Sequence, residues 1–368
     1  MNYPCLEINL QKLTHNTRML VKELNGMGIS VMGVNKVFNG DLETASAMIS
    51  GGMVVIAETM ACNLKKLEGL PCQKAMLRSP GLSEAAEIVK YADISLTGSI
   101  EAIKALSKEA VAQNRIHQIL LMVDMGDLRE GIWFEDLDEI EEALKQIIAL
   151  PNIKLYGLGT NFGCYGTVLA TAENTNQFVE IAKSMEKKLG IQFPYRSGGN
   201  GSTYYLAEQG LLPKEINHLR IGGQHIFGIE YTKGLYLNDY FHSSKDIKLL
   251  ASDVYLFKAE VLEVRTKPTF PVGILTVDAF MQKKTFEDRG VRRMAVLGFG
   301  LQEAPFGNLH PVEAGLKIMG QTSNHTVLDV EDAQHKVHVG DIITFEVDYT
   351  ALMHLCNAPS VEKSYIRR

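Results

Sequence analysis

A single pattern repeats over about the first 230 residues: a short apolar run ends in polar residues or glycine, and an amphipathic stretch follows. The apolar runs predict eight buried strands, over 30–36, 53–58, 74–79, 93–97, 118–125, 153–162, 193–199 and 218–228. The amphipathic stretches predict helices over 41–50, 62–67, 83–90, 99–113, 135–149, 172–189 and 202–209, and another over 11–24 precedes the first strand. Strands buried on both faces read as continuous apolar runs, and alternation with helices indicates right-handed parallel crossovers. The expected fold class is therefore α/β with a closed (β/α)8 TIM barrel, and a doubly wound open sheet is the alternative, because periodicity does not show closure.

The pattern changes after about residue 245. Short β-rich segments separated by turn residues follow, over 251–265, 272–278, 295–300, 316–319, 326–330 and 341–349. Such spacing is typical of an all-β domain. We therefore expect a barrel over 1–245 and a β-rich C-terminal domain over 246–368, with an N-terminal strand over 1–10 packing with the C-terminal domain.

Composition excludes several classes of protein. Of the 368 residues 46% are hydrophobic and 22% charged, and the net charge is −6, which argues against a disordered chain and against a nucleic-acid binder. The sequence contains no run of 18 apolar residues, so no membrane span is predicted, and the N-terminus lacks the apolar stretch of a signal peptide. The five cysteines are scattered and form no Cys-x-x-Cys pair, so neither disulfides nor a metal site is predicted. A soluble cytoplasmic protein is expected.

In a barrel, polar residues at the C-terminal ends of strands are the functional candidates. They are Lys36, Glu58, Arg78, Thr97, Asp124, Arg129, Asn161, Ser197, Asn200 and Arg220. Lys36 ends an otherwise apolar strand, where desolvation would lower the pKa of its amine and favour a Schiff-base nucleophile. The alternative is an ordinary solvated lysine. Arg129 lies between carboxylates, either as a structural ion pair or as a ligand clamp.

Two glycine-rich turns follow the last two predicted strands. Ser197-Gly-Gly-Asn-Gly-Ser-Thr203 opens a helix, and Leu219-Arg-Ile-Gly-Gly223 follows the eighth strand. Backbone amides at such turns bind anions, and barrels commonly bind phosphate with the loops after strands seven and eight. The sequence therefore predicts a phosphate-bearing ligand, with a flexible turn capped by Ser202 or Thr203 as the alternative.

Taken together, these residues resemble fold-type III pyridoxal-phosphate enzymes of the alanine racemase superfamily, and most closely its ornithine racemase group with related basic amino-acid racemases. The matching motifs are Gly33-Val-Asn-Lys36, Met122-Val-Asp-Met-Gly-Asp-Leu-Arg-Glu-Gly131, Ser197-Gly-Gly-Asn200, Leu219-Arg-Ile-Gly222 and Val339-Gly-Asp-Ile-Ile-Thr-Phe345 with Tyr349-Thr-Ala-Leu352.

The resemblance implies a role for each matching position. Lys36 would hold pyridoxal 5'-phosphate as a Schiff base and act as one catalytic base. Arg129 would lie near the phenolic oxygen, Asn161 against the ring, and Arg220 opposite the pyridine nitrogen. The phosphate cradle would comprise Ser197, Asn200, Gly201, Ser202, Thr203, Gly222 and Gly223.

The chain departs from the family pattern at three places. Alanine racemases carry a tyrosine from the partner subunit as the opposite-face base, whereas the aligned residue here is Phe299; Tyr349 and His325 are the candidates to replace it. The ornithine group usually has serine after the phosphate-loop asparagine and glutamate after Arg-x-Gly, where this chain has Gly201 and Gly223-Gln224. A base supplied by the partner implies a homodimer with shared active sites.

The function expected from the resemblance is pyridoxal-phosphate-dependent racemisation of a free amino acid, ornithine or another basic one, by proton transfer on both faces of Cα. One alternative is a decarboxylase on the same scaffold, but such enzymes place an acid where this chain has Arg220. The other is a non-catalytic pyridoxal-phosphate-binding protein, but such proteins are usually single barrels.

Overall fold

The computed structural model describes residues 2–229 and 250–367. It divides into two compact units, one of residues 10–252 and one of residues 1–9 with 253–368, and each is described by itself. The domain boundary expected between residues 245 and 246 lies outside the described residues.

The unit of residues 10–252 is a closed barrel of eight parallel strands. The strands are β2 (Ser30–Val34), β3 (Val55–Glu58), β4 (Gln73–Met76), β5 (Ile94–Thr97), β6 (His117–Asp124), β8 (Ile153–Gly159), β9 (Tyr195–Ser197) and β10 (His218–Ile221). Pairing of β10 with β2 and of β5 with β6 closes the sheet, which confirms the predicted barrel and rules out the open sheet. A short strand, β7 (Ile132–Trp133), is added beside β6.

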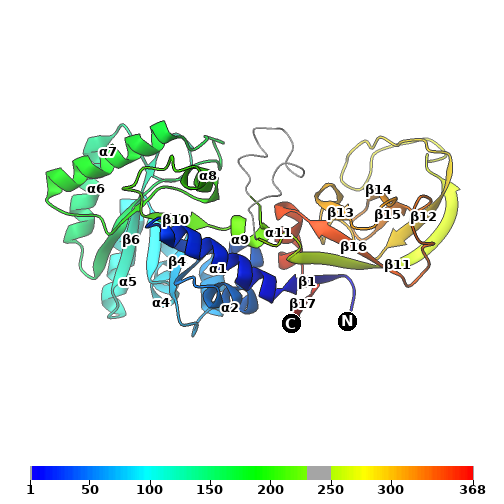
Figure 1. Ribbon diagram of the computed structural model, residues 1–368, viewed down its shortest axis with the longest axis horizontal. Coiled ribbons are helices and arrows are strands. Elements are labelled where there is room, and N and C mark those ends of the chain that lie inside the picture. The colour runs from blue at the N-terminus through cyan, green and yellow to red at the C-terminus, as the bar shows by residue number, and fades with distance from the viewer. Residues whose placement is uncertain (1, 230–249, 368) are drawn as a thin grey trace. The chain divides into compact units, whose positions relative to one another are not determined.

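Helices follow the strands, as the sequence predicts. They are α1 (Leu10–Gly26), α2 (Leu42–Ser50), α3 (Ala61–Lys66), α4 (Ala85–Tyr91), α5 (Ile100–Ala112), α6 (Leu137–Ala149), α7 (Ala172–Leu189), α8 (Tyr204–Glu208) and α9 (Gln224–Phe227), with short 3-10 turns η1 (Lys36–Phe38), η2 (Leu82–Glu84) and η3 (Gly201–Thr203). In Figure 1, α5, α6 and α7 lie outside the strands. The predicted strand over 218–228 is wrong in its second half, because the chain turns at two glycines and begins α9. None of the described helices is both long and apolar enough to cross a membrane.

Apolar side chains from the strands fill the inside of the barrel. Met32, Leu96, Leu120 and Met122 are buried there with their neighbours, and complete burial of such side chains stabilises a fold by about 1.5–3 kcal/mol each. The strands β8 and β9 approach so closely that a Cβ on Gly157 would lie 1.9 Å from a backbone oxygen, so only glycine fits.

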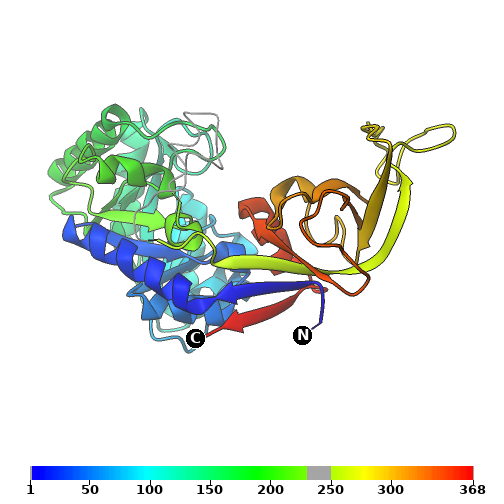
Figure 2. The same ribbon diagram turned by 45° about the vertical axis from the view of Figure 1, so that its right-hand side comes forward.

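The second unit contains an antiparallel sheet. Its strands are β11 (Tyr255–Pro268), β12 (Val291–Leu297), β13 (Leu309–Pro311), β14 (Lys317–Gln321), β15 (Thr326–Asp329) and β16 (Ile342–Val347), in the order β13-β16-β11-β12-β15-β14. The N-terminal strand β1 (Cys5–Asn9) pairs antiparallel with β11 and parallel with β17 (Glu362–Ile366), and these three strands lie side by side in Figure 2.

The separate β-sheet domain expected from the sequence is confirmed, but one expectation within it is wrong. Residues 272–278 form no strand; Val272 and Ile274 are almost fully exposed, because a β-prone run is stable only where a neighbouring strand pairs with it. A helix that the sequence analysis does not predict, α11 (Tyr349–Asn357), follows β16. The side chain of Asp348 accepts a hydrogen bond from the backbone of Ala351 at 3.0 Å as the N-cap of this helix.

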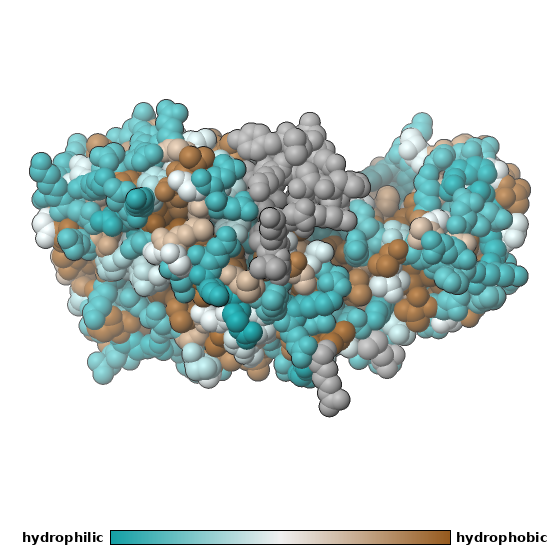
Figure 3. Space-filling model, viewed as in Figure 1, coloured by the Kyte–Doolittle hydropathy of each residue, from teal (hydrophilic) through white to brown (hydrophobic). Residues whose placement is uncertain are grey.

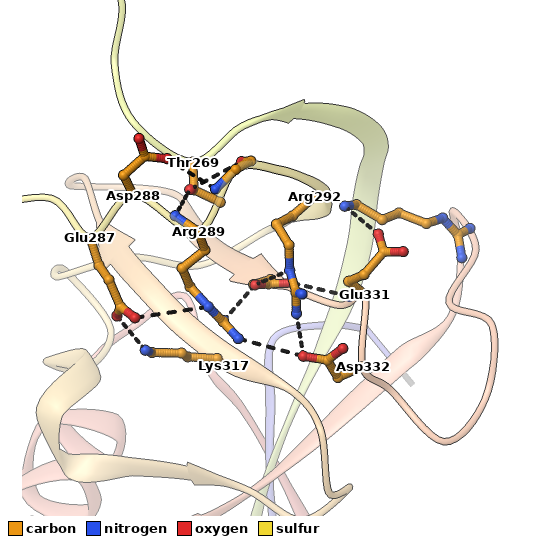
Figure 4. Close-up of polar contacts among 11 residues, drawn as sticks. Thr269, Glu287, Asp288, Arg289, Arg292, Lys317, Glu331 and Asp332 are labelled. Carbon is orange, nitrogen blue, oxygen red and sulfur yellow. Dashed lines mark hydrogen bonds and ion pairs between the residues drawn. The ribbon is translucent and has the colours of Figure 1, made fainter.

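Charged residues near the start of β12 and the end of β15 form a network (Figure 4). Asp329, 1% exposed, accepts hydrogen bonds from Arg289 Nη1 at 2.5 Å and from Arg292 Nε at 2.9 Å. Asp332 also contacts both guanidinium groups. Since an unpaired buried carboxylate is costly, the two arginines compensate Asp329 and hold the segment before β12 against β15.

The visible surface mixes hydrophilic and hydrophobic residues, with hydrophilic ones in excess (Figure 3). Singly exposed apolar residues are normal on a protein surface. The segment 270–286 of the second unit differs, because many exposed apolar residues occur close together in its sequence. They are Phe270, Val272, Ile274, Leu275, Val277, Phe280, Met281 and Phe286.

Candidate active site

Lys36 is the first residue of η1 and follows β2 after a single asparagine. Its side chain is exposed, and no side chain in the described part of the chain forms a hydrogen bond or ion pair with its Nζ. The prediction that Lys36 is partly desolvated is therefore wrong for the single chain, because the residue lies on a 3-10 turn beyond the strand. The amine is accessible at the C-terminal end of the barrel.

Arg220, on β10, is the buried charge of the barrel. It is 3% exposed, and its Nη1 donates to Ser197 Oγ at 2.6 Å while its Nη2 donates to Thr160 O at 2.7 Å and Asn161 Oδ1 at 3.4 Å. Burial lowers the pKa of Arg220 to about 10, so the group remains charged at neutral pH. All these partners are neutral, and a buried charge without a counter-charge favours a further acceptor.

His218, two residues before Arg220, shares the same serine. Its Nδ1 lies 2.8 Å from Ser197 Oγ. Burial, and then the charge of Arg220, lower the pKa of His218 to about 3, so its ring is neutral at physiological pH.

The loop after β9 is held by side-chain hydrogen bonds. Asn200 Nδ2 donates to Asn161 Oδ1 at 3.0 Å and to Phe162 O at 2.8 Å, and Asn200 Oδ1 accepts from the backbone N–H of Ser202 at 2.8 Å. Thr203 Oγ1 donates to Gly198 O at 3.1 Å. The loop predicted to bind phosphate is thus a fixed turn connected through Asn161 to Arg220.

Three backbone amides in the two glycine-rich turns have no acceptor within the described residues: those of Gly201, Gly222 and Gly223. Amides that point away from the protein's own carbonyls are suited to bind an anion. These amides are therefore the donors available for a phosphate.

Gln224 connects the two glycine-rich turns. Its Nε2 donates to Gly201 O at 2.7 Å, and the side chain is completely buried. A Cβ on residue 201 would lie 2.5 Å from Gln224 Oε1. The two departures from the ornithine-group pattern, at Gly201 and at Gly223-Gln224, therefore lie in direct contact with each other.

Arg129 forms an ion pair with the adjacent Glu130, as one of its two interpretations predicts. Burial lowers the pKa of Arg129, but the contact with Glu130 outweighs burial and raises it overall. Sequence reasoning missed Asp127, whose carboxylate accepts from Asn161 Nδ2 at 3.3 Å and from the Cys164 backbone N–H at 3.1 Å. Asp127 lies within the matching motif, which was the available signal.

The candidate opposite-face bases lie in the second unit. Tyr349 is half-buried in the first turn of α11, and His325 is exposed between β14 and β15. Phe299 is 1% exposed and packs edge-on against Phe257, with ring centroids 4.8 Å apart, and against Phe345 at 5.7 Å. Phe299 is therefore a core residue of this unit, and the roles of Tyr349 and His325 stay predictions. Over residues 2–229 and 250–367, no three His, Cys, Asp or Glu side chains form a cluster that could hold a metal.

The closed parallel barrel, with the strand-end motifs that it carries, has counterparts among known proteins. Residues 8–229 match the family model described as alanine racemase, N-terminal domain. The chain belongs to this family, which confirms the resemblance predicted from the motifs.

Three similar proteins illustrate the relationship. An ornithine racemase of Acetoanaerobium sticklandii is 35% identical over 99% of this chain and 100% of its own length. A lysine racemase of Thermotoga maritima is 34% identical over 99% of both chains. The crystal structure of alanine racemase from Bartonella henselae with covalently bound pyridoxal phosphate superimposes with a TM-score of 0.73 over 100% of both chains, at 14% identity, and so supports the fold.

Proposed function

We propose that this chain is a racemase that uses pyridoxal 5'-phosphate to interconvert the L and D forms of a free basic amino acid, ornithine or lysine. The observation that carries the proposal is one end of the barrel that combines the accessible amine of Lys36, the buried guanidinium of Arg220 and three acceptor-free amides. The two full-length similar racemases act on these amino acids by name, which supports a basic substrate.

The residues present fit the cofactor. Its aldehyde requires an amine, which Lys36 provides, and its phosphate requires donors, which Gly201, Gly222 and Gly223 provide. Arg220, held by neutral partners, would face the pyridine nitrogen. When bound, pyridoxal phosphate withdraws electrons from the Cα–H bond of an amino acid joined to it.

Arg220 decides between the racemase and the decarboxylase. The pKa of the Arg220 guanidinium, about 10, lies well above neutrality, so with the cofactor bound it would donate a hydrogen bond to the ring nitrogen and would leave that nitrogen unprotonated. An acid at this position would protonate the nitrogen and strengthen electron withdrawal. The arginine therefore favours racemisation over reactions that need a stronger electron sink.

Inversion at Cα requires a proton to leave one face and another to arrive at the opposite face, hence two groups. Lys36 Nζ is proposed as the first. Tyr349 and His325 are the proposed second groups, since both carry a transferable proton and Phe299 does not.

Incubation of single amino acids with the protein and pyridoxal phosphate in deuterated water tests the function. We expect L-ornithine or L-lysine to exchange its α-proton and to yield the D form. Mass spectrometry measures the exchange, and chiral chromatography measures the D form. Release of carbon dioxide and amine would indicate the decarboxylase. Absence of α-exchange with every amino acid tested would contradict the proposed racemase activity. This is the result expected of a non-catalytic binding protein.

We also propose a two-fold homodimer in the cytoplasm. The candidate second bases lie outside the barrel unit, and the exposed apolar residues of 270–286 are of the kind that protein interfaces cover. The five cysteines all lie within the described residues and form no disulfide there, which suits a reducing compartment. Sedimentation velocity should give twice the mass of 40.8 kDa; full activity from a strictly monomeric species would contradict the shared site.

A further inference from the structure

The turn that carries Lys36 is fixed although the lysine side chain is free. After Lys36–Phe38, Asn39 takes the left-handed conformation at φ 56°, and Gly40 follows at φ 70°. A Cβ on Gly40 would lie 2.9 Å from the Cα of Asn63, so the turn packs directly against the start of α3. The position of Lys36 therefore depends on what holds the two ends of this turn.

Glu58, the last residue of β3, holds both ends. It is completely buried, and its Oε1 accepts from Asn35 Nδ2 at 3.0 Å and from the backbone N–H of Gly40 at 3.0 Å. Asn35 immediately precedes Lys36, and Gly40 closes the turn after it. One oxygen thus joins the residue before Lys36 to the end of the turn.

A second set of contacts supports this arrangement. Thr44 Oγ1 donates to Asn35 Oδ1 at 3.2 Å, which uses the other end of the asparagine amide. Lys66 Nζ donates to Asn39 O at 2.8 Å and to Asn63 Oδ1 at 3.0 Å. The backbone around Lys36 is thereby fixed from β3, α2 and α3, and Glu58 is the only buried acid among these groups.

A buried carboxyl group is costly for a barrel to retain, since burial disfavours its charged form and raises the pKa of Glu58. An apolar residue would fill the same place at lower cost, but it could not accept from Asn35 and Gly40. The presence of a carboxyl group at position 58 is explained if the geometry of the turn matters for the amine of Lys36.

We propose that Glu58 is a positioning residue, which aims Lys36 at the cofactor aldehyde through its hydrogen bonds to Asn35 and Gly40. The inference rests on the proposed function in so far as Lys36 is the amine that binds the cofactor. Attack on a carbonyl requires a near-attack geometry, and a displacement of about 1 Å costs about 100-fold in rate. The consequence is a slower attachment of the cofactor without a change in the amine itself.

The experiment measures cofactor attachment rather than turnover. Full-length protein freed of cofactor is mixed with pyridoxal phosphate, the lysine adduct is trapped with borohydride at successive times, and its rate constant is determined by mass spectrometry. Glu58→Leu, which removes the acceptor at similar volume, is expected to slow attachment about 10- to 100-fold. Glu58→Gln keeps an oxygen that can accept from Asn35 and Gly40, and is expected to restore a rate within about threefold of the parent.

Ser107→Ala is the matched control, because it removes a buried hydroxyl that donates to Pro151 O at 2.7 Å at the opposite, N-terminal end of β8. It should lower stability without slowing attachment. A folded Glu58→Leu protein that attaches the cofactor as fast as the parent would overturn the inference. Should this variant not fold, Asn35→Ala, which removes one of the two bonds, is measured instead, and a parental rate would overturn the inference equally.

A Lys36→Ala arm separates this inference from the proposed function. If Lys36→Ala still forms the trapped adduct, the proposed function itself fails. If only Lys36→Ala abolishes the adduct and the Glu58 variants attach cofactor normally, the proposed function survives and the positioning role of Glu58 is wrong.

Discussion

Lys36→Ala is expected to abolish both racemisation and the visible absorption of the protein with pyridoxal phosphate. The loss of turnover should be at least about a thousandfold, since a positioned acid–base group alone contributes about 10²–10⁴ and the covalent attachment is lost with it. The side chain is exposed, and no described side chain pairs with it. The free energy of unfolding should therefore change by less than about 0.5 kcal/mol. Chiral assay, absorption spectroscopy and urea unfolding measure the three quantities.

Lys104→Ala provides the matched control for this experiment. Lys104 is another exposed lysine, on α5 of the same barrel unit. Its replacement should leave activity, colour and stability unchanged. Retention of the absorption band in the Lys36→Ala protein would show that another amine binds the cofactor, and would remove the assignment of Lys36.

Acidification is expected to destabilise the folded chain by several kcal/mol between about pH 6.5 and pH 4. Burial lowers the pKa of His117 to about 4, and of His218 and His225 to about 3. Above pH 6.5 these rings are neutral in both states, and below it only the unfolded chain binds the protons. Stability is therefore lost as pH falls, with a slope of up to about 1.4 kcal/mol per pH unit for each histidine. Glu58, whose pKa is raised by burial, contributes the opposite slope, but it is one group against three.

Urea unfolding at a series of pH values tests this prediction. The ring nitrogens of His225 have no hydrogen-bond partner among the described residues, so His225→Leu should reduce the slope by about one proton. Ile226→Leu is the control, because Ile226 is a completely buried neighbour of His225 on α9 that carries no titratable group, and its replacement should leave the slope unchanged. A free energy of unfolding that stays constant from pH 6.5 to pH 5, or a slope that His225→Leu does not alter, would contradict the assignment.

Much of the barrel could be predicted because each of its strands produces a recognisable pattern in a short stretch of sequence. A strand buried on both faces needs a continuous apolar run, and a crossover helix needs one apolar stripe, so each of the eight barrel strands overlaps its predicted segment. The second unit was predicted less well. Residues 272–278 carry β-prone side chains but have no partner strand, and α11 was overlooked although Ala351, Leu352 and Leu355 are buried at helical spacing.

The candidate site divides in the same way. The types of residue at strand ends, namely the lysine, the arginine and the glycine-rich turns, were readable as chemistry from the sequence and from the motifs that it shares with racemases. The connections among them were not. Nothing in the chain order indicates that Asn161 joins Asp127, Asn200 and Arg220, or that the side chain of Gln224 donates to Gly201 O.

By itself, the amino-acid order determined the alternation of parallel strands and helices, the family resemblance, and which side chains could carry a reaction, because periodicity and short motifs act over a few neighbouring residues. Only the tertiary structure decided that the sheet closes, that Lys36 is exposed on a turn held by Glu58, that Arg220 is buried among neutral partners, and that Phe299 is a core residue. Burial, hydrogen bonding and the pKa of a group depend on residues distant in sequence, and these are brought together only when the barrel closes.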